Sequence, residues 1–490
     1  MDRSKTSQYL ILVLCGINLV IIQFVMIREF TAILYGEELI IVLVSAAYFS
    51  GWSVGYFISD YFSEENLKFY AYLTLVFHLS LPWSIRFSAA RIYELGGRGW
   101  SLLAFLFAVS FLVSAFYSLF LPKFITEDDS SDAFQRMYSI GVIGTLLGIG
   151  LIFLVARHGT LPLLTTYYLV LAATISLLLR NYKLLISSGL IIFLIALFGA
   201  GLDKFSTEYV FRRRRNFKQV ESLFRSYSPY QKIDIIKTGG KEHRLYLDGL
   251  QNFNSSRLTR INYYVAGLPA RLYPFPRVLI MGSGSLSTVK YAAPRSRKIT
   301  VVELDPMMAQ ASLDIFRPLN QLRADRNWKL VVDDGKHFLM SSPEKYNLVV
   351  MDVPSPYSIQ EAVLHSKEFY QAVGGRLKTG GMISVHLSGY INRTYIAVRV
   401  CKALLAAFKD IYVIHCPDLY RDFAIAGNDL KFTADDIRKI LKKDRAPERT
   451  YIYDRQEVLK QLPEEGKAIS LDNMEVVLVK GWERLTGRFF

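Results

Sequence analysis

The stretch FPRVLIMGSGSLSTVKYAAPRSRKITVVELDP, residues 275–306, decides the fold of the C-terminal half. An apolar run at 278–281 enters a Gly-Ser-Gly turn, and a second apolar run ends at the carboxylate Glu303. Glycines between a strand and a helix allow a ligand to approach the backbone closely. Glu303 follows Gly282 by about 20 residues, the spacing at which a strand-end carboxylate accepts hydrogen bonds from both hydroxyls of an adenosine ribose. The stretch therefore predicts a nucleoside site.

Strand and helix patterns continue to alternate toward the C-terminus, which predicts a doubly wound, Rossmann-like α/β domain over residues 271–490. Asp334 and Asp352 each follow an apolar run, so we expect both carboxylates at the same crevice as Glu303. The alternative is that both cap the helices that follow them. The predicted strands are 277–281, 298–303, 329–332, 347–352, 381–386, 411–415 and 475–479.

A smaller β element is predicted before this domain. Residues 232–238 and 243–249 both alternate apolar and polar side chains and are separated by a Gly-Gly pair. Two such runs around a glycine turn are typical of a β-hairpin. We therefore expect a β-hairpin subdomain over 228–270.

The N-terminal 205 residues have the composition of a membrane domain. The whole chain is 51% hydrophobic, with a positive mean hydropathy of +0.23, which is too apolar for an ordinary soluble enzyme of 490 residues. Runs of roughly 20 apolar residues recur, enough to cross the hydrocarbon core as helices. The predicted spans are 9–27, 38–59, 69–85, 100–122, 137–156, 161–179 and 184–202.

Seven spans are predicted, and the count becomes six if one of the last two, separated only by residues 180–183, is re-entrant or broken. The first span runs into Arg28 and Glu29 without a cleavage site, so we expect it to be retained. Basic residues near a span favour the cytoplasmic side, so the run 212–215 places the C-terminal half in the cytoplasm. Residues 206–227 are predicted to be a juxtamembrane linker.

Other functional classes have little support in the sequence. Three cysteines, Cys15, Cys401 and Cys416, are too few and too scattered for a disulfide framework or a zinc site, and no metal site is predicted. No nucleic-acid motif accompanies the arginine run, so no nucleic-acid partner is expected. The spans contain no chain of carboxylates that would mark an ion path.

Glycine pairs four residues apart, at 51/55 and 144/148, predict close helix packing.

The motifs together resemble the spermidine synthases, or polyamine aminopropyltransferases, and in particular their membrane-bound bacterial relatives. In the membrane part, IREFTAILYGEELIIVLVSAAYFSGWSVGYF and YSIGVIGTLLGIG are similar to those relatives. The stretches that carry the resemblance in the C-terminal half are SPYQKIDIIKTGGKEHRLYLDGLQNFNSS, VLIMGSGS, VVELDP, VDDGKHFL and YNLVVMDVPSP.

The resemblance implies an aminopropyl transfer from decarboxylated S-adenosylmethionine to an amine, with release of methylthioadenosine and no tightly bound cofactor. Asp352 would be the general base, because only the unprotonated amine attacks. The donor-binding residues implied by the resemblance are Gln231 at the thioadenosine part, Glu303 at the ribose, Asp334 and Gly335 at the adenine end, and the turn residues Gly282, Gly284 and Ser285.

The sequence departs from the family where the amines bind. Ser285 replaces an Asp that binds the donor's amine, Ser355 replaces the second acid of the catalytic strand, and the family's Tyr-His-Glu stretch reads Ile261-Asn262-Tyr263. Each lost charge-assisted contact weakens amine binding by roughly 1–3 kcal/mol. The residues predicted on the acceptor side are Asn262, Tyr263, Ser355 and Tyr357.

Three hypotheses remain open at this point. The first is a membrane-anchored aminopropyltransferase in the bacterial cytoplasmic membrane, with lipid and a small amine as partners and a homo-oligomer left open. The second is transfer of a methyl or aminocarboxypropyl group from S-adenosylmethionine, because Ser285 can hydrogen-bond a carboxylate that Asp would repel. The third is a non-catalytic sensor of an adenosyl metabolite.

Overall fold

The computed structural model describes residues 5–34, 37–97, 99–119, 131–256, 259–323 and 327–486. Their contacts divide the chain into two compact units. Residues up to Lys241 and Tyr246–Leu250 form most of the first unit, whereas Glu242–Leu245 and Gln251–Glu483 form most of the second.

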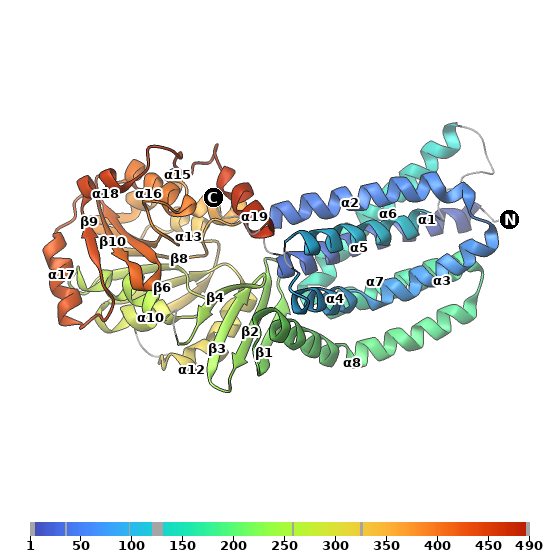
Figure 1. Cartoon of the computed structure of the whole chain (residues 1–490), viewed down its shortest axis with the longest axis horizontal. Coiled ribbons are helices and arrows are strands. Elements are labelled where there is room, and N and C mark those ends of the chain that lie inside the picture. Colours follow the sequence, from blue (N-terminus) through green and yellow to red (C-terminus); the bar gives the residue numbers. More distant parts are fainter. Residues whose placement is uncertain are drawn as a thin grey trace. The chain divides into compact units, whose positions relative to one another are not determined.

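Helices make up most of the first unit (Figure 1). Among the described helices, α1, α2, α5, α6, α7 and α8 are long and apolar enough to cross a membrane. The bounds are α1 Lys5–Leu34, α2 Glu37–Ile58, α3 Glu64–Ser80, α4 Trp83–Glu94, α5 Trp100–Ser118, α6 Ser131–Val155, α7 Thr160–Leu179 and α8 Tyr182–Arg215.

The third predicted span, 69–85, differs from the other six. It is divided between α3, which has 17 residues and ends at Ser80, and α4, for which Pro82 is the N-cap. The last two predicted spans are the separate long helices α7 and α8, so neither of them is broken. The predicted span that is not one long helix is the third. Residues 120–122, the end of the fourth predicted span, lie outside the described residues.

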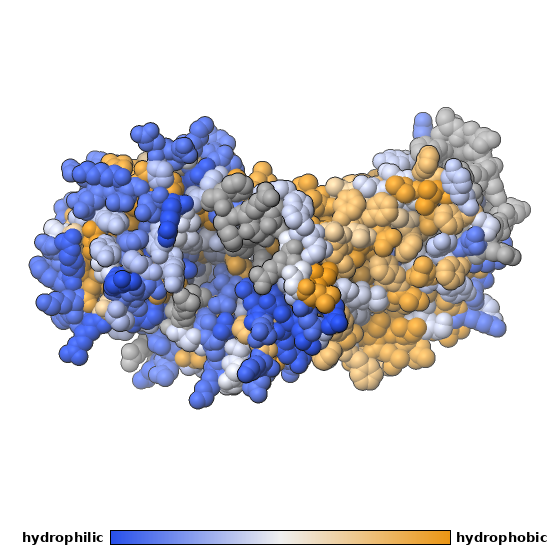
Figure 2. All heavy atoms as spheres, in the orientation of Figure 1, coloured by the Kyte–Doolittle hydropathy of each residue, from blue (hydrophilic) through white to orange (hydrophobic). Residues whose placement is uncertain are grey.

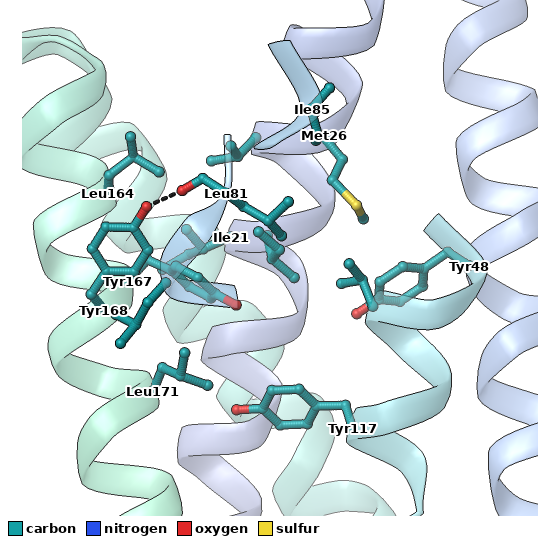
Figure 3. Close-up of a cluster of buried hydrophobic side chains, with 14 of the residues drawn as sticks. Ile21, Met26, Tyr48, Leu81, Ile85, Tyr117, Leu164, Tyr167, Tyr168 and Leu171 are labelled. Carbon is teal, nitrogen blue, oxygen red and sulfur yellow. Dashed lines mark hydrogen bonds between the residues drawn. The ribbon is translucent and has the colours of Figure 1, made fainter. Parts of the chain in front are cut away.

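The helices expose apolar side chains outward and bury a mixed core. Figure 2 shows apolar residues over much of the visible surface of the helices, where Phe153, Ile186 and Phe193 are exposed. Inside, Tyr167 and Tyr168 pack with Leu81 and Leu171, and the Tyr168 hydroxyl donates to the Leu81 carbonyl (Figure 3). An apolar exterior suits lipid contact, whereas the buried hydroxyl still has its partner.

The glycine spacings pack helices together as predicted. A Cβ at Gly51 would lie 2.1 Å from the Phe111 carbonyl oxygen, so α2 packs directly against the backbone of α5. A Cβ at Gly144 would lie 2.3 Å from the Val13 carbonyl oxygen, which brings α6 equally close to α1. Small residues allow backbones to approach this closely.

A buried ion cluster joins three helices to the first strand. Arg86 on α4 donates to both Glu29 carboxylate oxygens at 2.8 Å and to Asp203 at 2.5 Å. Asp203 also accepts from Arg225 on β1 at 2.7 Å, and the Tyr227 hydroxyl donates to Glu29 at 2.7 Å. Because the buried charges are paired and hydrogen-bonded, their desolvation is compensated.

A four-stranded sheet follows, in the order β1-β2-β3-β4. The predicted hairpin is confirmed, since β2 and β3 flank the Gly-Gly turn. The expected linker 206–227 consists of the end of α8 and strand β1. The strands are β1 Val220–Tyr227, β2 Lys232–Thr238, β3 Glu242–Leu247 and β4 Leu250–Asn254.

The second unit contains an eight-stranded mixed sheet in the order β12-β10-β11-β9-β8-β5-β6-β7. The strands are β5 Arg277–Gly282, β6 Lys298–Glu303, β7 Trp328–Val332, β8 Tyr346–Asp352, β9 Leu377–His386, β10 Asp410–Cys416, β11 Arg421–Gly427 and β12 Tyr451–Tyr453. The helices are α9 Thr259–Asn262, α10 Ser287–Ala292, α11 Pro306–Ala311, α12 Arg317–Leu319, α13 Gly335–Ser341, α14 Ile359–Leu364, α15 Lys367–Arg376, α16 Tyr395–Ala407, α17 Ala434–Lys443, α18 Arg455–Gln461 and α19 Glu475–Thr486.

Strand β5 lies in the middle of the parallel part and is covered on both faces. Val278 and Ile280 pack into one apolar cluster, and Leu279 and Met281 pack into another. Alternate side chains of a strand point to opposite faces, so an unbroken apolar run marks a strand buried on both sides. The chain passes from β5 to β6 on one side and later returns to β8 on the other. This reversal creates the crevice at which such sheets bind ligands.

The predicted strands need correction at residues 475–479, and strands β11 and β12 were not predicted. Residues 475–479 are not a strand but the start of α19, where Val476, Val477 and Lys480 are buried on one helix face. The prediction was wrong because the short β-branched run outweighed the helical spacing that continues beyond it. Strand β11 was missed because three of its seven residues are Ala or Gly, which are depleted in strands.

Candidate functional site at the carboxyl ends of β5, β6 and β8

The glycine turn begins where β5 and β8 are in direct register. Gly282 pairs with Asp352 across the two parallel strands, and the Ser283 N–H donates to the Asp352 carbonyl at 3.2 Å. Gly282 has φ +81°, and a Cβ there would lie 2.4 Å from the same carbonyl oxygen. Only glycine fits this position without moving the backbone of β8.

Two hydroxyls hold the Asp352 carboxylate at the end of β8. Thr288, on the first turn of α10, donates to Asp352 Oδ2 at 2.8 Å and is itself hydrogen-bonded to Ser283. Burial raises the pKa of Asp352 to about 6, although the hydrogen bonds from Thr288 and Ser283 oppose that increase. Asp352 is therefore a carboxylate whose pKa lies close to neutral pH.

Glu303 ends the neighbouring strand β6 and is buried. Burial raises the pKa of Glu303 to about 7; the Asp305 N–H, 3.2 Å from Oε1, opposes the increase, and the charges of Asp305 and Asp352 add to it. The Asp352 contribution means that the two predicted acids influence each other electrostatically. Their assignment to one site stays a prediction.

Asp334 and Gly335 follow β7 on the other side of Glu303. The Asp333 N–H donates to the Glu303 carbonyl at 3.1 Å, which fixes the two strand ends side by side. Asp334 caps α13, because its Oδ1 accepts from the N–H groups of Lys336 and His337 at 2.7 and 3.0 Å. The capping alternative is therefore realised for Asp334, and both bonds end on the same oxygen.

The turn residues Gly284 and Ser285 are held by the segment that follows β6. The Gly284 carbonyl accepts from the Ser312 hydroxyl at 2.7 Å, and the Ser285 carbonyl accepts from the Asn320 amide at 2.8 Å. The Ser285 side chain is buried, and its Oγ accepts a long hydrogen bond from the Ser287 N–H at 3.4 Å. The hydroxyl proton of Ser285 remains available to a ligand.

Of the residues predicted on the acceptor side, Asn262 and Tyr263 lie at the junction of α9 with a π-helical turn. The Tyr263 hydroxyl donates to Asp444 Oδ2 at 2.7 Å, which ties its ring to the end of α17. Ser355 and Tyr357 lie in the loop after β8, and the Tyr357 N–H donates to the Ser355 carbonyl at 2.7 Å. Ser355 therefore lies in the loop three residues after Asp352, whereas Tyr263 is hydrogen-bonded to Asp444.

Gln231 belongs to the first unit, in the turn that leads into β2. Its backbone carbonyl accepts from the Ser228 N–H at 2.9 Å and closes that turn. Its role in donor binding stays a prediction.

Sequence reasoning did not assign Thr288, His386 or Ser388. Thr288 is a small hydroxyl residue on the helix that follows the glycine turn, and this position in the sequence could have identified it as a candidate site residue. His386 and Ser388 lie at the end of β9, beside the loop after Asp352. Within the described ranges, no three His, Cys, Asp or Glu side chains gather to hold a metal ion.

The chain resembles known proteins in this region. Residues 260–423 match the family described as the spermine/spermidine synthase domain. Polyamine aminopropyltransferase 2 of Aquifex aeolicus is 30% identical over 195 residues, which cover 39% of this chain and 38% of that protein. The polyamine aminopropyltransferase of Agathobacter rectalis is 28% identical over 235 residues, covering 46% of this chain and 81% of that protein.

Solved structures match the same half at lower identity. A spermidine synthase in complex with the transition state analogue AdoDATO is 18% identical, with a TM-score of 0.40 over 54% of this chain and 88% of that chain. A probable spermidine synthase from Corynebacterium glutamicum is 19% identical, with a TM-score of 0.40 over 50% of this chain and 96% of that chain.

The second unit therefore has a doubly wound α/β fold with carboxylates at the ends of β6 and β8. The C-terminal half contains a spermine/spermidine synthase domain, and polyamine aminopropyltransferases are its distant homologues.

Proposed function

We propose that the protein is a membrane-anchored polyamine aminopropyltransferase of the spermidine synthase type. The acceptor nitrogen attacks the aminopropyl carbon bonded to the sulfonium of decarboxylated S-adenosylmethionine. The C–S bond breaks, its electron pair stays on sulfur, and methylthioadenosine leaves as a neutral thioether. The observation that carries the proposal is the pair of carboxylates at the ends of the two strands that flank β5, the buried Glu303 and the partly buried Asp352, within the region that matches the spermine/spermidine synthase domain.

Asp352 is the proposed general base. An alkylamine has a pKa of about 10 and is mostly protonated at neutral pH, so a nearby base must take its proton before or during attack. A carboxylate with a pKa of about 6 is ionised at pH 7 and is more basic than an exposed Asp. Thr288 fixes its orientation. General-base catalysis of this kind contributes roughly 10²- to 10⁴-fold to a rate.

The donor is proposed to lie along the carboxyl ends of the strands. Glu303 would accept from the ribose hydroxyls, and Asp334 with Gly335 would contact the adenine end, using the Asp334 oxygen not engaged in capping. Gly282, Gly284 and Ser285 would border the amine end of the donor. The positive sulfonium would favour the ionised forms of Glu303 and Asp352.

The acceptor is proposed to bind near Ser355 and Tyr357, with Asn262 and Tyr263 as further contacts. Aromatic rings hold ammonium groups by cation–π contacts of about 0.5–2 kcal/mol, which offsets part of the missing acidic charge. The membrane helices would anchor the enzyme in a bacterial cytoplasmic membrane with the second unit in the cytoplasm, in contact with lipid.

A second function is favoured by Ser285. Its buried hydroxyl replaces the acid that would repel the carboxylate of unmodified S-adenosylmethionine. In that case the same site would transfer a methyl or aminocarboxypropyl group. The two functions differ in the donor consumed.

The test of the leading proposal is the variant Asp352→Asn in detergent-purified full-length protein. We expect methylthioadenosine release from decarboxylated S-adenosylmethionine to fall by at least about 100-fold. Methylthioadenosine affinity, measured by calorimetry, should remain within about threefold, because the amide keeps the shape of the side chain. Asp314→Asn, an exposed carboxylate that pairs with Gln310, is the matched control. Full turnover in Asp352→Asn would exclude Asp352 as the base.

A further inference from the structure

A chain of three polar side chains lies beside the loop that follows Asp352. The Ser355 hydroxyl is hydrogen-bonded to the Ser388 hydroxyl, which lies 3.1 Å from Nδ1 of His386. His386 Nε2 lies 3.3 Å from the Val353 carbonyl oxygen. The chain therefore starts at Ser355 and returns to the same loop at Val353.

The direction of every hydrogen bond in this chain follows from its last member. A carbonyl oxygen only accepts, so Nε2 of His386 carries the proton and Nδ1 is the acceptor. Ser388 then donates to Nδ1 and must accept from Ser355. The Ser355 proton is used within the chain, and its oxygen offers only lone pairs to a ligand.

The hydrogen-bonded chain formed by Ser355, Ser388 and His386 is also uncharged. The pKa of His386 is lowered to about 3, mainly by burial and to a smaller extent by Arg421 and His365, although the hydrogen bond to Val353 opposes the decrease. A second imidazole fixes the same loop: His365 Nε2 lies 3.0 Å from the Pro354 carbonyl, and Nδ1 lies 2.9 Å from the Tyr370 hydroxyl. Ser355 is thus a neutral hydrogen-bond acceptor in a loop that both imidazoles hold.

Besides Asp352, two carboxylates on neighbouring segments, Glu361 and Asp422, already have partners. Glu361 accepts from the N–H groups of Tyr357 and Ser358, both at 2.9 Å. Asp422 is fully buried and pairs with His415 at 2.7 Å and with the Ile391 N–H at 2.8 Å. A second ammonium group bound at this side of Asp352 would therefore be desolvated without a counter-ion from Glu361 or Asp422.

We propose that Ser355, Ser388 and His386 are positioning residues that select an acceptor with a single ammonium group, a monoamine, over a diamine or polyamine. This inference rests on the proposed aminopropyl transfer. Ser355 accepts a hydrogen bond from the nitrogen of the acceptor amine. This bond directs the nitrogen lone pair toward the aminopropyl carbon of decarboxylated S-adenosylmethionine, and Asp352 takes the amine proton. The imidazole of His386 is too weak a base to take that role.

The test compares 1-aminobutane with 1,4-diaminobutane, which differ by one amine at equal chain length. With decarboxylated S-adenosylmethionine as donor, we expect the full-length enzyme to show a higher kcat/KM for 1-aminobutane. Ser355→Asp should shift the ratio toward the diamine by about tenfold or more, because it supplies a charged partner. Ser341→Asp, which adds a carboxylate at an exposed position, should leave the ratio unchanged.

Two further variants separate positioning from a structural role. His386→Leu removes the group that orients Ser388 and should raise the acceptor KM by about tenfold, with little change in the donor KM. His386→Gln should lower the acceptor KM again, because its amide oxygen accepts from Ser388 and its NH₂ donates to Val353. An equal loss in both variants would overturn the assigned role of His386.

The outcomes also separate this inference from the proposed function. If the enzyme releases methylthioadenosine but prefers the diamine, and Ser355→Asp does not change that preference, the inference alone is wrong. If no amine supports release, both are wrong.

Discussion

Thr288 donates its hydroxyl proton to Oδ2 of Asp352 at 2.8 Å, from the first turn of the helix that the glycine turn opens. This bond favours the ionised form of a carboxylate whose burial favours the protonated form. The ionisation of Asp352 therefore depends on a residue outside the strand-end acids.

The first prediction concerns pH. A base must be unprotonated, so kcat/KM for the donor should fall as the pH drops through about 6, the pKa of Asp352. Glu303 has a pKa of about 7 and should make this acidic limb steeper. Thr288→Val removes a hydrogen bond to the ionised form and should move the limb upward by about one pH unit. A pH profile unchanged in Thr288→Val would contradict the role of this bond.

The second prediction concerns Gly282. Alanine there needs φ +81° and a Cβ 2.4 Å from the Asp352 carbonyl oxygen, so β5 and β8 must separate. We expect Gly282→Ala to destabilise the protein by more than about 2 kcal/mol and to abolish nucleoside binding. Gly375→Ala is the control, because that helical glycine has open space around it and alanine favours helix by about 1 kcal/mol. Equal thermal stability of the two variants would refute the steric account.

The third prediction concerns Glu303. Replacing it with Gln keeps the shape but removes the charge that would accept from the ribose hydroxyls. Methylthioadenosine affinity should fall by about 10- to 100-fold, as expected for loss of charge-assisted hydrogen bonds. Glu344→Gln, at a partly exposed surface pair with Lys298, should bind normally. Calorimetry gives the answer directly, and normal affinity in Glu303→Gln would remove the ribose assignment.

The fourth prediction concerns donor choice. Ser285→Asp introduces a carboxylate that would repel the carboxylate of S-adenosylmethionine and attract the amine of the decarboxylated donor. The ratio of kcat/KM for the decarboxylated over the ordinary donor should rise by at least about tenfold. An unchanged ratio would show that Ser285 does not border the end of the donor that distinguishes the two compounds.

The fifth prediction concerns the ion cluster in the first unit. Glu29→Ala leaves the buried guanidinium of Arg86 without its bidentate partner, which should cost about 3–5 kcal/mol. Glu94→Ala breaks partly exposed pairs with Arg91 and Arg213 and should cost at most about 1 kcal/mol. Thermal unfolding in detergent measures both, and similar losses would contradict the importance of burial.

The sequence predicted the strands that carry the site because their signals are local. The run at 278–281 is apolar on both faces of β5, and Glu303 and Asp352 end their strands as the spacing indicates. Strand β11 and helix α19 were misjudged because their state depends on neighbours: β11 pairs with β9 and β10 despite its Ala and Gly residues.

Side-chain partners were harder to predict than strands. Nothing in the spacing links Thr288 to Asp352 or Ser355 to His386, because these contacts join segments brought together only by the folded sheet. For the same reason Tyr263 was predicted for the acceptor side, and its hydrogen bond to Asp444 was not foreseen. The capping role of Asp334 was weighed, since a carboxylate before a helix is a local signal.

The most direct test of the central claim is a mass-spectrometric turnover assay on detergent-purified protein. Decarboxylated and ordinary S-adenosylmethionine are offered separately, each with a mixture of monoamines, diamines and polyamines. The proposed function predicts methylthioadenosine, together with an amine lengthened by one aminopropyl group, from the decarboxylated donor. Products from the ordinary donor alone, or no product from either donor while methylthioadenosine still binds, would contradict aminopropyl transfer.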